Sequence, residues 1–329
     1  MADNRVTRAN TPAHLQGFSI GYKPRGLIAD QVCPRITVGK QSGKYRVWGK
    51  DIYYLRDGRR APGAPPNEMR VSYASDVYAC EDFALRHPLL DEERTNADAD
   101  LRLEARYTEA ATLAVALMRE KRVSDLFTTA GNFATTHKKA IGASSEWDTL
   151  LSSAPQNVIN DINVGIQTVS DDASIPASML SIVMPEQVFR KAVLNNSAYL
   201  DRVKYAAMGI VTEQLMATVH GVKEIILSSA QGIAMPEKVV ADLAADLAPS
   251  ALWGDSVWIG VIGQPESEME PAFARSFNWT AGSNGQTREV RTYRAADEGE
   301  RKDWIEVAEW MDEKITGSLG GYLITNTLG

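Results

Sequence analysis

The feature that most constrains this sequence is the run of residues 98–129, which contains neither glycine nor proline. Ala, Leu, Glu, Arg and Met dominate it, and all of these residues favour helix. Apolar side chains recur along it at intervals of three and four, at Leu103, Tyr107, Ala110, Ala114 and Leu117, widened by Ala111, Val115 and Met118. The spacing predicts one helix over about 98–129, roughly 45–50 Å long at 1.5 Å per residue. Such a helix is longer than a compact domain needs, so we expect it to be a strut across which other parts or other subunits lie.

Composition narrows the class of protein. With 329 residues the chain can bury a large core, in two lobes or one elaborate domain. Its net charge of −7 disfavours tight direct binding to DNA or RNA, because proteins that coat nucleic acid are normally basic. The polar start Met1–Arg8 lacks a secretory signal, and no apolar run is long enough to span a bilayer, so no membrane partner is expected. The isolated Cys33 and Cys80 predict free thiols.

The first part of the chain predicts an extended arm followed by a projecting hairpin. Residues 1–43 are rich in glycine, proline and polar residues, and Gly26–Val38 suggests a brief helical turn and then a strand. Residues 45–55 and 71–80 have the composition of two strands, with a turn-rich tip at 56–67 between them. The hairpin is basic although the chain is acidic, with Lys44, Arg46, Lys50, Arg56, Arg59, Arg60 and Arg70.

Acidic residues gather where the chain approaches the long helix. This acidic cluster consists of Asp91, Glu92, Glu93, Asp98, Asp100, Glu104 and Glu109. A basic hairpin and an acidic strut in one sequence can pair between two copies, since charge complementarity sets register and orientation. The intersubunit contacts expected on this basis join Arg56, Arg59, Arg60 and Arg70 to Asp91, Glu92, Glu93, Asp98, Asp100 and Glu104. The alternative is that the hairpin is a solvated loop whose charges pair with nothing.

The second half predicts an α/β block and then a β-rich end. Short buried strands are expected at 179–184, 224–228 and 257–262, with helices from Pro155, Pro185 and Leu215. Residues 272–329 are expected to be mostly strands, and Gly321–Thr325 is the last of them.

No motif for catalysis or for cofactor binding is present. The chain has no P-loop, no dinucleotide fingerprint, no nucleophile elbow and no zinc-protease helix motif. Its four histidines lack metal-ligand spacing, and the run Asn96–Asp100 departs from a calcium loop because Leu101 stands where glycine is required. Asp91, Glu92 and Glu93 could form an acid/base cluster, but adjacent exposed carboxylates are usually solvated. We therefore predict no catalytic, cofactor or metal site and a protein that is not an enzyme.

The order of these parts resembles the major capsid proteins of tailed bacteriophages, with the Hong Kong ninety-seven fold. The stretches that carry the resemblance are Gly21–Gly39, Glu146–Val169, Ile182–Ser228 and the final GGYLITN. The resemblance implies an α+β fold with an N-arm at 1–43 and an extended β-hairpin E-loop at 44–84. It also implies a peripheral domain at 85–173 with a spine helix at about 98–129, an α/β axial domain at 174–268 and closing peripheral strands at 269–329.

The resemblance further implies a structural protein that self-assembles into the hexamers and pentamers of an icosahedral virion shell, assembled in the host bacterial cytoplasm. The shell would enclose double-stranded DNA without gripping it tightly or specifically. Implied partners are further copies of the chain, a portal and possibly a decoration protein. A separate scaffolding protein is implied because no long helical segment precedes the arm. Two alternatives stay open, an encapsulin-like compartment shell and a cytosolic α/β enzyme or ligand-binding protein with its site in 174–268.

Overall fold

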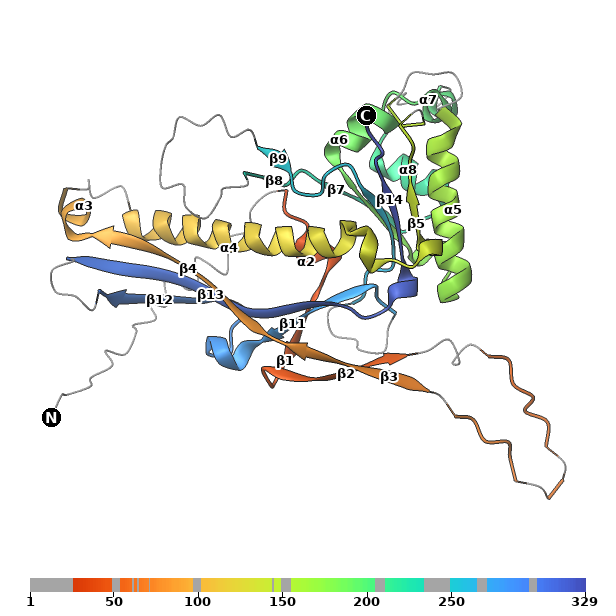
Figure 1. Cartoon of the computed structure of the whole chain (residues 1–329), viewed down its shortest axis with the longest axis horizontal. Helices are drawn as coiled ribbons and strands as arrows, with labels where there is room; N and C mark the ends of the chain where they lie inside the picture. Colours follow the sequence, from red (N-terminus) through yellow and green to blue (C-terminus); the bar gives the residue numbers. More distant parts are fainter. Residues whose placement is uncertain are drawn as a thin grey trace.

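The computed structural model describes residues 26–48, 54–60, 62–63, 65–70, 72–96, 102–143, 145–148, 155–204, 211–233, 249–264, 271–295 and 301–329. One long helix lies along a first sheet and forms an elongated limb (Figure 1). A second sheet, covered by shorter helices, stands across one end of this limb, and a hairpin projects from below the same end (Figure 1).

The N-terminal segment has the predicted helical turn followed by a strand. Helix α2 spans Ala29–Val32, and strand β1 spans Arg35–Val38. β1 pairs in parallel with β11 (Ala274–Trp279), so the start of the described chain is built into the first sheet. Cys33 and Cys80 are buried free thiols, as predicted.

The hairpin is formed by β2 (Ser42–Trp48) and β3 (Tyr73–Ala79), which pair antiparallel with Tyr45 opposite Asp76. The first strand ends sooner than predicted. Tyr54 and Leu55, which were expected to continue it, lie outside any regular strand, whereas Ile52 and Tyr53 lie outside the described residues.

The long helix begins later than predicted. A short helix α3 (Asp91–Asn96) precedes the main helix α4 (Leu103–Thr128), so one continuous helix from residue 98 is wrong. Arg102, just before α4, has φ 38°, a left-handed conformation that does not continue an α-helix. Asp98 and Asp100 lie outside the described residues.

The predicted apolar stripe of α4 is only half buried. Ala111 and Val115 face the core, but Ala110 and Met118 are exposed. The buried face also carries polar residues that hydropathy would place in water, and its members are Thr108, Ala111, Thr112, Val115, Arg119, Glu120, Val123, Ser124 and Phe127.

The first sheet lies beneath α4. Its central strand β13 (Lys302–Ile315) pairs along one edge with β4 (Glu81–Leu90) and along the other with β12 (Glu289–Arg294) and β11. All of these pairs are antiparallel. A small core joins the sheet to the helix through Leu89, Ala111, Val115, Val290, Ile305 and Val307.

The second sheet forms the α/β block, in the order β5-β14-β10-β6-β7. Its strands are β5 (Lys138–Ala140), β6 (Ser181–Pro185), β7 (Glu224–Ser228), β10 (Val257–Gly260) and β14 (Gly321–Thr325). Its helices are α5 (Pro155–Ala173), α6 (Glu186–Val188, continued by a π-turn over Phe189–Val193), α7 (Ser197–Val203) and α8 (Glu213–His220). A two-stranded ribbon of β8 (Gln231–Gly232) and β9 (Ser250–Ala251) lies beside it. The three predicted strands and the helix from Pro155 are confirmed.

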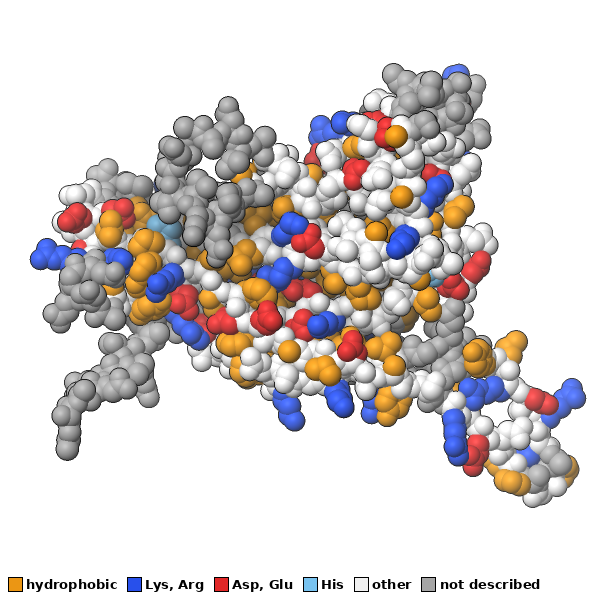
Figure 2. All heavy atoms as spheres, in the orientation of Figure 1, with side chains coloured by type: hydrophobic (Ala, Val, Ile, Leu, Met, Phe, Trp, Pro, Cys, Tyr) orange, Lys and Arg blue, Asp and Glu red, His pale blue; other side chains and the backbone are white. Residues whose placement is uncertain are grey.

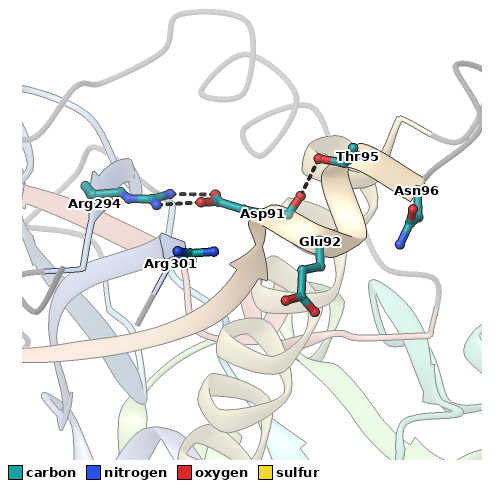
Figure 3. A pocket seen from close by; sticks show the side chains of 6 residues that line it. All are labelled: Asp91, Glu92, Thr95, Asn96, Arg294 and Arg301. Atoms are coloured by element: carbon teal, nitrogen blue, oxygen red, sulfur yellow. Dashed lines mark hydrogen bonds and ion pairs between the residues drawn. The ribbon is translucent and has the colours of Figure 1, made fainter. Parts of the chain in front are cut away.

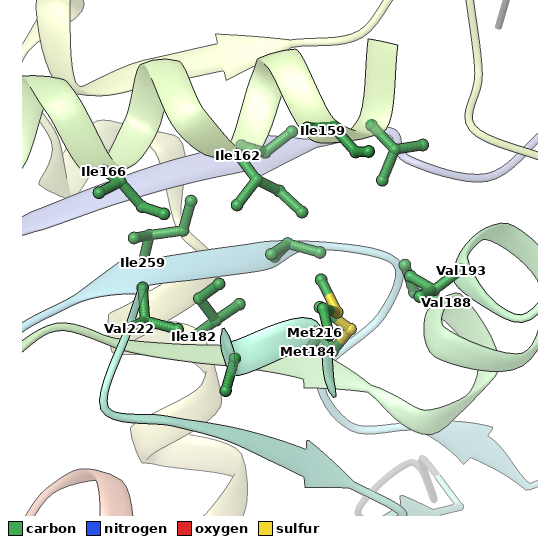
Figure 4. Close-up of a cluster of buried hydrophobic side chains, with 14 of the residues drawn as sticks. Ile159, Ile162, Ile166, Ile182, Met184, Val188, Val193, Met216, Val222 and Ile259 are labelled. Carbon is green, nitrogen blue, oxygen red and sulfur yellow. The ribbon is translucent and has the colours of Figure 1, made fainter. Parts of the chain in front are cut away.

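The second sheet and its core include elements on both sides of the range 174–268 predicted for the α/β block. Helix α5 was assigned to the preceding part, yet its Ile162 packs in one core with Ile182 and Ile259 of the second sheet (Figure 4). Strand β14 was expected to close the β-rich part, but it pairs with β10 and β5 instead. The α/β block therefore includes β5, α5 and the end of the chain. The sequence did not reveal this, because pairing between strands that are far apart in sequence leaves no local pattern.

Candidate functional site

The paired strands β2 and β3 form the shaft of the hairpin, and aromatic packing fixes this shaft to β11 of the first sheet. Tyr78 stacks on Phe277 with ring centroids 4.6 Å apart, and Tyr45 lies 5.1 Å from the same ring. The Tyr45 hydroxyl donates to Asp76 at 3.0 Å, and burial, with this contact, raises the pKa of Tyr45. Because side chains alternate along a strand, the opposite face of the shaft presents Tyr73 and Val77 to solvent.

Beyond the shaft, the described residues of the hairpin are exposed. Arg56 donates to the carbonyl of Arg70 at 3.1 Å across the hairpin, and Arg70 lies 3.4 Å from Glu68. Arg59 and Arg60 are exposed. The tip carries both basic and apolar side chains (Figure 2). The described tip therefore presents its side chains outward instead of packing on the body.

The acidic cluster is partly neutralised within the chain. Arg294 donates to both carboxylate oxygens of Asp91, at 2.6 and 2.5 Å, and these hydrogen bonds lower the pKa of Asp91 (Figure 3). Glu104 pairs with Arg94 at 3.1 Å, and Glu93 accepts the Tyr107 hydroxyl at 3.2 Å.

Glu92 differs from these acids. It lines an open pocket of about 570 Å³ together with Asp91, Thr95, Asn96, Arg294 and Arg301 (Figure 3). Glu92 is exposed, and no hydrogen bond or ion pair joins it to another residue of the described chain. Among the described acids of the cluster, Glu92 is therefore both exposed and free to pair with an incoming cation.

The structure does not bring the predicted partners together within one chain. α3 and the hairpin lie at opposite ends of the elongated limb (Figure 1). The basic residues of the tip therefore meet the acidic cluster only if two copies of the chain associate. Asp98 and Asp100 of the predicted set lie outside the described residues.

Sequence reasoning missed a clamp formed by two adjacent residues of α4, Arg119 and Glu120. Glu120 accepts the backbone N–H groups of Ile28 and Ala29, at 3.0 and 2.8 Å, where α2 begins. Arg119 donates to the carbonyl of Cys33 at 3.0 Å, where α2 ends. The negative group caps the start of the turn and the positive group its end, the favourable arrangement for the helix dipole. This Arg119–Glu120 clamp holds the N-terminal segment on the long helix.

Arg119 also belongs to a ring of six side chains of alternating charge. Around the ring, Asp30 pairs with Arg35 at 2.8 Å, Arg35 with Glu309 at 3.3 Å, and Glu309 with Arg122 at 3.8 Å. Arg122 pairs with Glu313 at 3.0 Å, Glu313 lies 3.9 Å from Arg119, and Arg119 closes the ring on Asp30. This charge ring ties the N-terminal segment, α4 and β13 together. A usable signal was the placement of Arg119 and Arg122 on one helix face and of Glu309 and Glu313 on one strand face.

No histidine in the described part is arranged for catalysis. His220 is buried between the Tyr199 hydroxyl, at 2.6 Å, and Asn163, at 2.7 Å, and burial lowers its pKa to about 4. Within the described ranges, no group of three or more His, Cys, Asp and Glu side chains could hold a metal ion. Among the helices described, none is both long and apolar enough to cross a membrane.

Comparison with known proteins agrees with this reading of the fold. No protein-family model matches the chain. The chain is 24% identical to the major capsid protein of Burkholderia phage BcepMu over 321 residues, which cover 96% of each chain. The structure of a phage-related protein from Bordetella bronchiseptica RB50 superposes with a TM-score of 0.73 at 21% identity, covering 97% of this chain and 98% of that one.

The fold is also that of a capsid whose structure is known. The capsid chain of cyanophage P-SCSP1u superposes with a TM-score of 0.59 at 10% identity, covering 89% of this chain and 86% of that one. Over nearly its whole length, the chain is therefore similar in sequence to a capsid protein and similar in fold to a capsid structure. By this likeness the chain is similar to a phage major capsid protein, and its fold is similar to that of a phage capsid chain.

Proposed function

We propose that the chain forms the hexamers and pentamers of an icosahedral head that encloses double-stranded DNA. In this arrangement the hairpin is the extended loop that crosses a neighbouring copy. The observation that carries the proposal is the separation of the exposed basic tip from the acidic cluster at the opposite end of the same chain (Figure 1). Complementary charges that cannot meet within one chain can meet between two, and there they set register and orientation.

The described parts take the roles that this fold gives them. The first sheet with α4 as its spine helix is the peripheral domain, and the second sheet with α5–α8 is the axial domain. The axial domains meet around the centre of each capsomer. Both assignments follow the sheets, so the axial domain includes α5 and β14 and is larger than the sequence suggested.

The net charge of −7 supports a container that does not grip its DNA tightly, because like charges keep the wall and the phosphates apart. A scaffolding protein, a portal and a decoration protein are further proposed partners of the assembly, with the host bacterial cytoplasm as its place.

Charge reversal at the tip tests the docking role. The double change Arg59→Glu and Arg60→Glu is expected to reduce the yield of closed particles seen by electron microscopy. The charge-conserving pair Arg59→Lys and Arg60→Lys is the matched control and is expected to keep them. Adding Glu92→Arg and Glu93→Arg to the reversed tip is expected to restore particles in part, since the attraction is then recreated with opposite signs. Particles of the reversed-tip variant that match the wild type in yield and stability would refute the docking role.

The contents of the particles test the nature of the container. Particles purified from infected cells are expected to hold double-stranded DNA. Particles that hold protein cargo instead would support the encapsulin-like alternative.

A further inference from the structure

The loop that joins β11 to β12 contains two consecutive residues with a left-handed backbone. A short 3-10 helix spans Thr280–Ser283, and the next residues, Asn284 and Gly285, have φ 52° and 81°. Asparagine is the usual substitute for glycine in this conformation at the end of a helix. Both residues are exposed, and they form the one Asn-Gly pair in the sequence.

An asparagine followed by glycine carries an electrophile and a nucleophile on adjacent residues. The backbone nitrogen of Gly285 can attack the side-chain carbonyl carbon of Asn284, because glycine has no Cβ to hinder the approach. A Cβ built at Gly285 would meet nothing of the described chain within 4 Å. As the new bond forms, the bond from that carbon to Nδ2 breaks, and ammonia leaves with the proton of the Gly285 N–H. Water then opens the cyclic imide to aspartate or isoaspartate, so the reaction needs neither an oxidant nor a reductant.

In the folded chain both reacting groups are held by other partners. The Gly285 N–H donates to the carbonyl of Thr280 at 2.7 Å, at the short end of the usual range. The Asn284 amide nitrogen donates to a carboxylate oxygen of Glu289, the first residue of β12. The nucleophile and the group that it must attack are therefore tied to two different parts of the loop.

Glu289 is a rigid acceptor for the Asn284 amide. It is 2% exposed, and its other carboxylate oxygen accepts Arg291 at 2.6 Å. Glu289 also lies opposite Ala308 in the first sheet, so its position is fixed by strand pairing. Hydrogen bonds to an ionised carboxylate are stronger than neutral ones. The amide is therefore released only when the loop moves away from β12.

The other side of the loop packs on two tryptophans. A Cβ built at Gly282 would lie 2.6 Å from the Trp279 ring and 3.0 Å from the Trp310 ring. The two rings pack edge to face with their centroids 5.2 Å apart. The loop is thus closed by this packing on one side and by Glu289 on the other. Opening it costs free energy, and the reaction is slowed by the fraction of time for which the loop is open.

We propose that Asn284 is a site of spontaneous deamidation that the closed loop suppresses, and that Glu289 is the side chain that holds the amide. In the product a carboxylate replaces the amide donor beside the buried carboxylate of Glu289, and the two like charges repel. Isoaspartate also adds a carbon to the backbone of the left-handed turn. The modification therefore weakens the loop in which it occurs and marks chains in which this loop has opened. The inference is independent of the proposed function, because it concerns contacts within one chain.

Mass spectrometry of the unassembled full chain tests the protection. Trypsin cuts after Arg275 and Arg288, so a single peptide, 276–288, carries the site. The wild-type chain is incubated at mildly alkaline pH, folded in one sample and unfolded in urea in the other, before digestion. Conversion is expected to be at least about tenfold slower in the folded sample. Equal rates in the two samples would overturn the proposal, because the fold would then give no protection.

Glu289→Ala tests the role of the carboxylate. It is expected to raise the conversion rate of the folded chain by about tenfold, as the loss of one hydrogen bond to a charged group implies, and to leave the rate in urea unchanged. Val290→Ala is the matched control, because it weakens the same strand from the buried side that packs on α4. An unchanged rate in Glu289→Ala, or an equal rise in Val290→Ala, would overturn the role of Glu289. Glu289→Asp, which draws the carboxylate back but keeps its charge, takes the place of Glu289→Ala if that chain does not fold.

Discussion

Glu120 of the long helix accepts the indole N–H of Trp253 at 2.6 Å, and neither side chain is open to solvent. The same carboxylate caps the first N–H groups of α2, so a single buried acid joins three distant parts of the sequence. Burial raises the pKa of Glu120, and the hydrogen bonds from Trp253, Ala29 and Ile28 oppose this effect. These hydrogen bonds anchor the N-terminal segment on α4.

Replacing this acid removes the cap without changing the sheets. Glu120→Ala is expected to lower the free energy of unfolding by about 2–4 kcal/mol, because it leaves buried N–H donors unpaired and opens a cavity. Chemical denaturation of unassembled chains measures the change. Hydrogen exchange at Ile28 and Ala29 is expected to rise. Asp125→Asn, at the exposed pair of Asp125 with Lys121, is the control and is expected to change stability by about 0.5 kcal/mol or less. Equal losses for both variants would contradict the capping role.

The charge ring makes Glu309 the most sensitive carboxylate of the first sheet. Its side chain is fully buried among Arg35, Arg122 and Arg288. Glu309→Gln is expected to cost about 3–5 kcal/mol of stability, because removing one partner leaves buried guanidinium charges uncompensated. Glu306→Gln, on the same strand but with its side chain 20% exposed, is expected to cost much less. A stable Glu309→Gln chain would show that the ring does not hold the first sheet on the helix.

Because of His220, we expect the stability of the folded chain to fall in acid where α5, α7 and α8 meet. Its pKa is lowered from 6.5 to about 4 in the folded chain, by burial and by the nearby Arg202. Below pH 6.5 the unfolded chain therefore binds a proton that the folded chain refuses. The stability contributed by neutral His220 is complete above pH 6.5 and falls by about 3 kcal/mol as the pH drops to 4.

Denaturation between pH 8 and pH 4 measures this loss. His220→Gln is expected to flatten the part of the profile between pH 6.5 and 4, because no imidazole is left to titrate. A wild-type profile that the substitution leaves unchanged would exclude His220 as the titrating group.

Gly260 of β10 leaves no room for a side chain where it packs against Gly320. A Cβ atom built there would lie 2.4 Å from the carbonyl oxygen of Gly320 and 2.4 Å from the Trp258 ring. Gly260→Ala is expected to destabilise the second sheet by about 1–3 kcal/mol, because a backbone atom cannot move aside as a side chain can. Gly142→Ala, which meets nothing within 4 Å, is the control for thermal unfolding.

Local patterns in the sequence predicted which helices and strands form better than they predicted which of these elements pack together. The strands at 181–185, 224–228 and 257–260 follow from short β-branched runs, and the helix from Pro155 follows from its apolar spacing. The pairing of β14 with β10 and β5 joins residues far apart in sequence, which no local pattern encodes. For the same reason the sequence did not show that β5, α5 and β14 contribute to the second sheet and its core.

The functional surfaces were predicted in part. The exposed basic tip and the acidic cluster follow from charge alone, but the in-chain pairing of Asp91 with Arg294 depends on tertiary contact. Periodicity identified the apolar stripe of the long helix but could not show that one side of it faces solvent. The buried face instead uses Arg119 and Glu120, which composition assigns to the surface.

Electron cryomicroscopy of particles assembled from the full chain tests the central claim most directly. We expect closed shells in which density for the hairpin of each copy crosses a neighbouring copy, with Arg59 and Arg60 at the acidic cluster of that copy. Chains that remain monomeric at micromolar concentration, or shells in which the hairpin contacts no neighbouring copy, would contradict this expectation.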